Sequence, residues 1–170
     1  MAHSLRYASM PGKLCGGDMK GPVGNSILAI DPGPKESAYV WWENGKPIAF
    51  SKMNNSELRA ILKTSKPSDI TAIEMIASYG MAVGKEVFET AVWIGRFQEC
   101  CIDPFSVMLV YRKDVKLYWC GQTRAKDSNI RQALLDRFGH QGTKKTPGLL
   151  YGVSGDVWSA VAIAAMLESQ

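Results

Sequence analysis

Histidine and cysteine are scarce in this 170-residue chain, and their spacing argues against the commonest protein metal site. There are two histidines, His3 and His140. The four cysteines include no pair in C-x-x-C spacing: Cys15, Cys100, Cys101 and Cys120. Structural zinc sites use clustered cysteines and histidines, so we expect none here. Reduced thiols and a cytoplasmic location are the corresponding expectation.

Long apolar runs are also missing. No stretch approaches the roughly 18 to 20 apolar residues that a membrane-spanning helix requires, so we expect no membrane partner. Residues 1–25 lack the continuous apolar segment of a signal peptide, and glycine and proline interrupt them repeatedly. We therefore expect residues 1–25 to form a flexible extension and residues 26–170 to form one domain.

The first half of this domain has the pattern of an antiparallel meander. Residues 27–31 form an apolar run closed by Pro32-Gly33, which predicts a buried strand ending in a sharp turn. Residues 37–43 are rich in β-forming side chains. Asn44-Gly45 favours a tight hairpin turn into a third strand at 47–52.

A crossover then follows the meander. A short helix opens at Ser56, and an apolar stretch at 70–76 predicts a fourth strand. Because a helix separates them, this strand should run parallel to the first. Helical periodicity at 85–101 and a fifth strand at 106–110 come next.

Two further predicted helices complete the domain. One begins at Asp127-Ser128 and ends at Gly139, and the last begins near Gly155-Asp156. The sequence thus predicts an α/β fold with a mixed five-stranded sheet, an antiparallel three-strand meander plus parallel strands, flanked by helices.

Three acids stand at the ends of these elements. Asp31 ends the first strand, Glu74 interrupts the fourth, and Asp156 opens the last helix. Each has a plainer explanation, respectively a turn cap, a strand-edge salt bridge and a helix N-cap. Together, three oxygen ligands at one end of a sheet suit Mg²⁺, and two such ions can promote phosphodiester hydrolysis.

The motifs around these acids resemble a known family. They are Ile-Asp-Pro-Gly at 30–33, Ala-Ile-Glu at 72–74 and Asp-Val-Trp-Ser-Ala-Val-Ala-Ile-Ala at 156–164. Val115-Lys116 before Gly121, and the segment 124–130, add to the pattern. Over residues 27–167 the chain resembles RuvC-type Holliday-junction resolvases of the RNase H-like superfamily, and it looks closest to phage-encoded RuvC-like proteins.

The resemblance implies an RNase H-like fold and a metal-dependent endonuclease that cleaves branched DNA, foremost four-way (Holliday) junctions, in recombination and repair. It implies Asp31, Glu74 and Asp156 as catalytic metal ligands for Mg²⁺, with Mn²⁺ able to substitute. A homodimer acting in the cytoplasm of a bacterial host is the expected setting. The chain departs from the pattern at Ser159, where these enzymes usually carry a fourth acid, so Ser159 is a weaker candidate ligand.

The basic residues are concentrated in one segment. Between residues 112 and 145 there are nine lysines and arginines against three aspartates. We expect those in loops or at helix ends to contact DNA phosphates: Lys116, Arg124, Lys126, Lys144 and Lys145. For Arg131 and Arg137 a solvated helix face is preferred. Tyr79, in the loop after the Glu74 strand, either wedges against bases at a junction or folds back on the core.

Two other functions remain to be weighed. The missing fourth acid favours a non-catalytic or weakly catalytic protein that binds branched DNA. An actin-like ATPase also uses an Asp-x-Gly turn after its first strand, but it needs two such domains and a second phosphate loop, more than 170 residues can hold.

Overall fold

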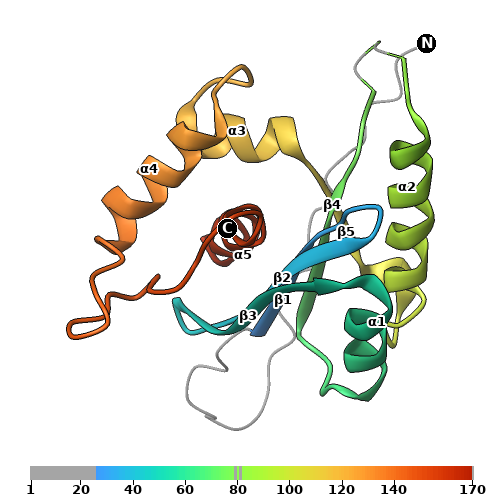
Figure 1. Ribbon diagram of the computed structural model, residues 1–170, viewed down its shortest axis with the longest axis horizontal. Coiled ribbons are helices and arrows are strands. Elements are labelled where there is room, and N and C mark those ends of the chain that lie inside the picture. The colour runs from blue at the N-terminus through green and yellow to red at the C-terminus, as the bar shows by residue number, and fades with distance from the viewer. Residues whose placement is uncertain (1–25, 79, 81, 170) are drawn as a thin grey trace, which may run out of the picture.

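A mixed five-stranded sheet, in the order β3-β2-β1-β4-β5, is the centre of the fold (Figure 1). The computed structural model describes residues 26–78, 80 and 82–169, so the expected extension at 1–25 lies outside it. The first three strands pair antiparallel, whereas the last two continue the sheet parallel to β1. The strands are β1 (Ser26–Asp31), β2 (Glu36–Glu43), β3 (Lys46–Asn54), β4 (Ile70–Met75) and β5 (Met108–Tyr111). The predicted mixed sheet is confirmed.

Helices cover both faces of this sheet (Figure 1). One face carries α1 and α2, and the other carries α5, with α3 and α4 packed beyond α5. A short 3₁₀ turn at Pro104–Ser106 precedes β5. The helices are α1 (Asn55–Thr64), α2 (Lys85–Gln98), α3 (Arg112–Cys120), α4 (Asp127–Phe138) and α5 (Val157–Glu168). None of the helices in the described part of the chain is both long and apolar enough to cross a membrane.

The helix α5 is buried on nearly all sides because it is apolar all round. It packs between the sheet and the α3–α4 pair. At its carboxyl end, the Glu168 carboxylate accepts hydrogen bonds from the Trp42 indole at 2.8 Å and from the backbone N–H of Gly45 at 2.6 Å. These bonds tie one end of α5 to the β2–β3 hairpin and so fix how the helix lies across the sheet.

The helix α3 was not predicted. It begins with a charged run and continues with large aromatic and apolar side chains that show no clear helical period. Val115 is completely buried, and the Trp119 indole donates a hydrogen bond to the backbone carbonyl of Ala162 in α5 at 3.0 Å. Tertiary packing rather than local propensity therefore stabilises this helix.

Candidate active site

Asp31 and Glu74 lie side by side at the carboxyl ends of two neighbouring parallel strands. The register pairs Ile30 with Ile73, so each acid is the next residue along its strand. Both side chains are mostly buried, and Glu74 is only 13% exposed. A cavity of about 260 Å³ opens beside them, with Pro32 and Arg112 also in its wall. We call Asp31 and Glu74 the acid pair.

The turn after Asp31 is held by two buried polar residues that the sequence patterns did not single out. The Ser37 hydroxyl donates to the Asn55 side-chain carbonyl at 2.6 Å, and the Asn55 amide donates to the backbone carbonyl of Gly33 at 2.8 Å. A Cβ on Gly33 would lie 2.5 Å from the carbonyl oxygen of Glu36, so only glycine fits. Because Ser37 and Asn55 secure the turn, the Asp31 carboxylate is left for another role.

The acid pair is costly to ionise in its buried setting. Burial raises the pKa of Asp31 to about 6, and repulsion from Asp156 adds to this, although a hydrogen bond from Ser159 and the charge of Arg112 oppose it. Burial, and then repulsion from Asp31, raise the pKa of Glu74 to about 7. A bound cation would relieve both effects.

Arg112 is the basic group nearest Glu74. Its guanidinium lies 3.4 Å from a Glu74 oxygen and 2.9 Å from an Asp127 oxygen, and its side chain is 22% exposed. Lys116 approaches the same Asp127 oxygen at 3.7 Å. The predicted salt bridge of Glu74 is therefore present, but at an interior strand rather than at the edge of the sheet.

Asp156 occupies the N-cap position of α5 without a side-chain capping hydrogen bond. Its carboxylate instead lies 2.8 Å from the Lys52 ammonium, which is also 3.7 Å from Glu36. Within residues 26–78, 80 and 82–169, no three His, Cys, Asp or Glu side chains lie close enough together to hold one metal ion as they stand. Asp156 instead meets Lys52 of β3.

The donor atoms that are available suit a hard divalent cation. Asp31 and Glu74 present carboxylate oxygens, the ligands that Mg²⁺ prefers, at a place where negative charge is in excess. The Ser159 hydroxyl, one helical turn after Asp156, lowers the pKa of Asp31 and so favours its charged form. Asp31 and Glu74 could hold an ion directly, whereas one carboxylate oxygen of Asp156 is engaged by Lys52.

The basic residues expected at DNA divide into two groups. Arg124, Lys126, Lys144 and Lys145 are exposed, in loops or at the start of α4. The expected position of Lys116 is wrong: it lies inside α3, with its side chain 23% exposed and turned to Asp127. Tyr79 lies outside the described residues.

Arg131 and Arg137 pack against aromatic rings instead of extending freely into solvent. The Arg131 guanidinium stacks over Trp158 at 4.9 Å from the ring centroid. Arg137 stacks over Trp119 at 5.6 Å and donates a hydrogen bond to the Ser169 hydroxyl at 2.8 Å. Both residues are exposed on α4, so the predicted solvated helix face is present, and the stacking adds a packing contact for each arginine.

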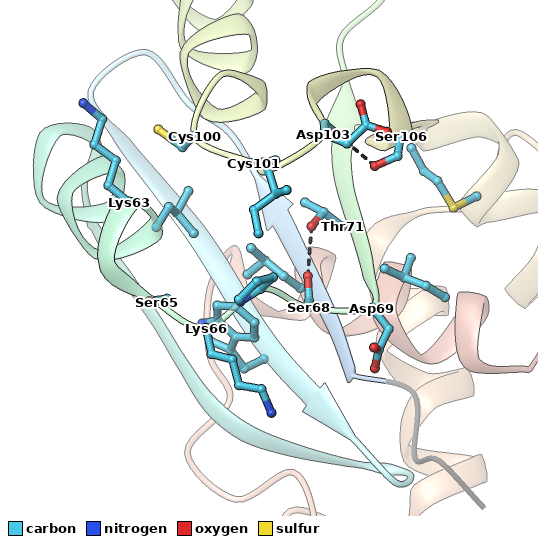
Figure 2. Close-up of a pocket in the computed structure, with 17 residues that line it drawn as sticks. Lys63, Ser65, Lys66, Ser68, Asp69, Thr71, Cys100, Cys101, Asp103 and Ser106 are labelled. Atoms are coloured by element: carbon cyan, nitrogen blue, oxygen red, sulfur yellow. Dashed lines mark hydrogen bonds between the residues drawn. The ribbon is translucent and has the colours of Figure 1, made fainter. Parts of the chain in front are cut away.

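A larger cavity, of about 510 Å³, lies at the opposite end of β1 and β4. Figure 2 shows its lining, which includes Cys100 and Cys101 after α2 and the hydrogen-bonded hydroxyls of Ser68 and Thr71, 2.9 Å apart. None of the acids or basic residues singled out by the sequence motifs lines it. Size alone therefore does not identify the site, and the chemistry favours the acid pair.

The raised pKa values predict how the metal-free protein responds to pH. Both acids bind protons more tightly in the folded chain than at their ordinary pKa values of 3.8 and 4.5. Their contribution to stability is therefore complete below about pH 4 and is lost as the pH rises through about 7. In EDTA, Glu74→Gln should raise the free energy of unfolding at pH 8 by on the order of 2 kcal/mol and change it little at pH 4. Denaturant titrations of both proteins at the two pH values measure this, and an equal effect at both would contradict it.

Comparison with solved structures identifies the fold. No protein-family model and no curated protein matches the chain. It is similar to the structure of Thermus thermophilus RuvC, with 12% identity, a TM-score of 0.62 and coverage of 83% of this chain and 92% of that one. It is also similar to T. thermophilus RuvC in complex with a Holliday junction substrate, with 13% identity, a TM-score of 0.63 and coverage of 84% and 92%. The chain therefore has a RuvC-like fold, of the RNase H-like type.

Proposed function

We propose that this chain is a metal-dependent, structure-selective endonuclease that cleaves branched DNA, with four-way junctions as its main substrate. The observation that carries the proposal is the acid pair: two buried carboxylates, with pKa values raised to about 6 and about 7, at the carboxyl ends of β1 and β4 in a RuvC-like fold. Buried carboxylates with excess charge are costly to a fold, and a metal site accounts for their presence.

Asp31, Glu74 and, once it leaves Lys52, Asp156 would hold the ion. The chemistry supplied by a Mg²⁺ ion held there would be the activation of water for attack on phosphorus and the stabilisation of the departing oxygen. The chain's own residues prepare the site. Ser159 lowers the pKa of Asp31 and so favours its charged form, and the Arg112 guanidinium lies 3.4 Å from a Glu74 oxygen, on the side of β4 away from β1.

The proposed DNA-binding surface consists of the exposed basic residues at the start of α4 and in the loop after it: Arg124, Lys126, Lys144 and Lys145. Their positive charge would bind the phosphates of the DNA backbone independently of the base sequence. The similar Thermus protein has been solved with a Holliday junction substrate, which supports a branched DNA partner for this chain.

We also propose that the protein acts as a homodimer. Symmetric cutting of two strands requires two sites related by a two-fold axis. The helix α2 exposes large apolar side chains on the face turned away from the sheet, with Phe88 61% and Val92 52% exposed, and Trp93 beside them is partly buried. An apolar helix face of this kind suits a self-complementary interface.

A cleavage assay tests the proposed activity. End-labelled four-way junction and linear duplex of the same sequence are incubated with protein in Mg²⁺, Mn²⁺, Ca²⁺ or EDTA. We expect cleavage of the junction in Mg²⁺ and Mn²⁺, binding without appreciable cleavage in Ca²⁺, and little cleavage of the duplex.

The second candidate is a protein that binds branched DNA without cutting it. Two observations favour it: Ser159 takes the place of the usual fourth acid, and Lys52 engages Asp156. Tight junction binding with no cleavage in any metal would select this candidate over the first.

Charge reversal at Lys126 tests the DNA-binding surface. Its position at the N-cap of α4 accepts an acidic residue without cost to the helix. Lys126→Glu should weaken junction binding and reduce the slope of log affinity against log salt by about 1, because one phosphate contact is lost. Lys46→Glu, at the start of β3, is the matched control and should leave the slope unchanged. An unchanged slope in Lys126→Glu would remove that residue from the surface.

A further inference from the structure

We infer, on the basis of the proposed function, that the site takes one divalent cation per chain, because Lys52 and Arg112 supply positive charge at its two sides.

The position of Lys52 follows from the sheet itself. Asp31 pairs with Ala38 across β1 and β2, and Ala38 pairs with Lys52 across β2 and β3. Residues directly opposite one another in a sheet project from the same face, so Asp31, Ala38 and Lys52 form one row beneath α5. Two strand spacings separate Asp31 from Lys52, roughly 10 Å. The small Ala38 between them leaves room for Asp156 to meet Lys52.

Arg112 bounds the row on its other side. Glu74 continues the row past Asp31, and the guanidinium lies against it at 3.4 Å. Arg112 is fixed because its second nitrogen bonds Asp127 at 2.9 Å and only 22% of its side chain is exposed. The acids thus lie between two basic side chains, Lys52 and Arg112. Each of these also contacts a second carboxylate: Glu36 for Lys52 and Asp127 for Arg112.

The charge of the whole cluster matches one dication. Five carboxylates are linked by ion pairs or by mutual electrostatic effects, and three basic groups lie among them. Five negative and three positive charges leave two negative charges, which one divalent cation balances. We call these groups the charge network: Asp31, Glu36, Glu74, Asp127, Asp156, Lys52, Arg112 and Lys116.

A second dication would leave the cluster with two positive charges. Its central groups are mostly buried, with Glu74 13%, Arg112 22% and Lys116 23% exposed, whereas Lys52, Glu36, Asp156 and Asp127 are 43% to 68% exposed. The electrostatic repulsion between a second ion and this positive charge is strong where solvent screens it poorly. Ser159 adds no compensating charge, because its hydroxyl is neutral. The site therefore lacks both the ligand and the negative charge that a second ion would need.

Counting bound Mn²⁺ tests this inference without reference to activity. The full chain, free of DNA, is titrated with Mn²⁺ at pH 8 by equilibrium dialysis and by electron paramagnetic resonance of the free ion, with Mg²⁺ as competitor. We expect one Mg²⁺-displaceable Mn²⁺ per chain, and its loss in Asp31→Asn. Lys52→Gln should bind that ion roughly tenfold more tightly, because one competing positive charge is removed.

A double variant provides the opposite case. Lys52→Gln removes one positive charge, and Ser159→Asp adds one carboxylate with its negative charge. The net charge of the network falls by two in the double variant, so we expect it to bind two Mn²⁺ per chain. Lys46→Gln is the matched control and should bind one. If the double variant fails to fold, as judged by circular dichroism, the affinity of Lys52→Gln carries the test.

The outcomes separate the inference from the proposed function. Two ions bound by the natural chain would overturn the one-ion inference and leave the nuclease proposal standing. No displaceable ion would overturn the metal site and the inference with it. An unchanged affinity in Lys52→Gln, or one ion in a folded double variant, would show that charge does not limit occupancy.

Discussion

Asp31→Asn, Glu74→Gln and Asp156→Asn should each reduce cleavage of a four-way junction by on the order of 10²- to 10³-fold, the loss expected when a group that stabilises developing charge is removed. Each substitution keeps the shape of the side chain and removes its charge. Junction binding should persist in all three, because the proposed phosphate contacts lie on other residues. Rates under single-turnover conditions, with gel-shift affinities measured in Ca²⁺, give both quantities.

The matched control is Glu57→Gln, which alters an exposed acid in the first turn of α1. It should cut at the natural rate. Natural activity in any of the three variants would remove that residue from the site. Loss of activity together with loss of binding would indicate misfolding, which thermal melts of the same preparations detect.

The largest expected effect on assembly comes from the exposed face of α2. Phe88→Glu combined with Val92→Glu places two charges in the proposed dimer interface. If each of the two positions contributes about 2 kcal/mol to the dimer, counting both copies, the dimer dissociation constant should rise by roughly 10³-fold. Because both residues are more than half exposed, the fold of the chain should be little affected. Light scattering after size-exclusion chromatography measures the mass.

The control for this experiment is Ile102→Glu, which alters an apolar residue that is 82% exposed and lies beyond the end of α2. It should remain a dimer. A natural chain that is monomeric at micromolar concentration, both alone and with junction DNA, would rule out the dimer. Monomers that still cut both strands in one binding event would show that symmetry is not required.

The sheet was predictable because its signals are local. The apolar run before Asp31 and the Asn44-Gly45 turn each fix one feature of the meander, and both turn residues adopt the positive φ values that a tight hairpin needs, 50° and 78°. Once β4 is known to run parallel to β1, the strand register alone makes Asp31 and Glu74 neighbours.

The contacts of the acids were not predictable from local signals. Lys52 meets Asp156 only because the hairpin register and the placement of α5 bring together residues far apart in the chain. Arg112 reaches Glu74 from a helix, α3, that tertiary packing stabilises. The sequence identifies which groups carry the chemistry, whereas long-range packing decides which cation each of them meets.

Anomalous diffraction from crystals equilibrated with Mn²⁺ tests the central claim most directly, because it locates the ion without an activity measurement. We expect one peak per chain within coordination distance of oxygens of both Asp31 and Glu74, and no such peak in crystals of Asp31→Asn. A well-ordered acid pair with no peak between its carboxylates, at a Mn²⁺ concentration that supports junction cleavage, would contradict it.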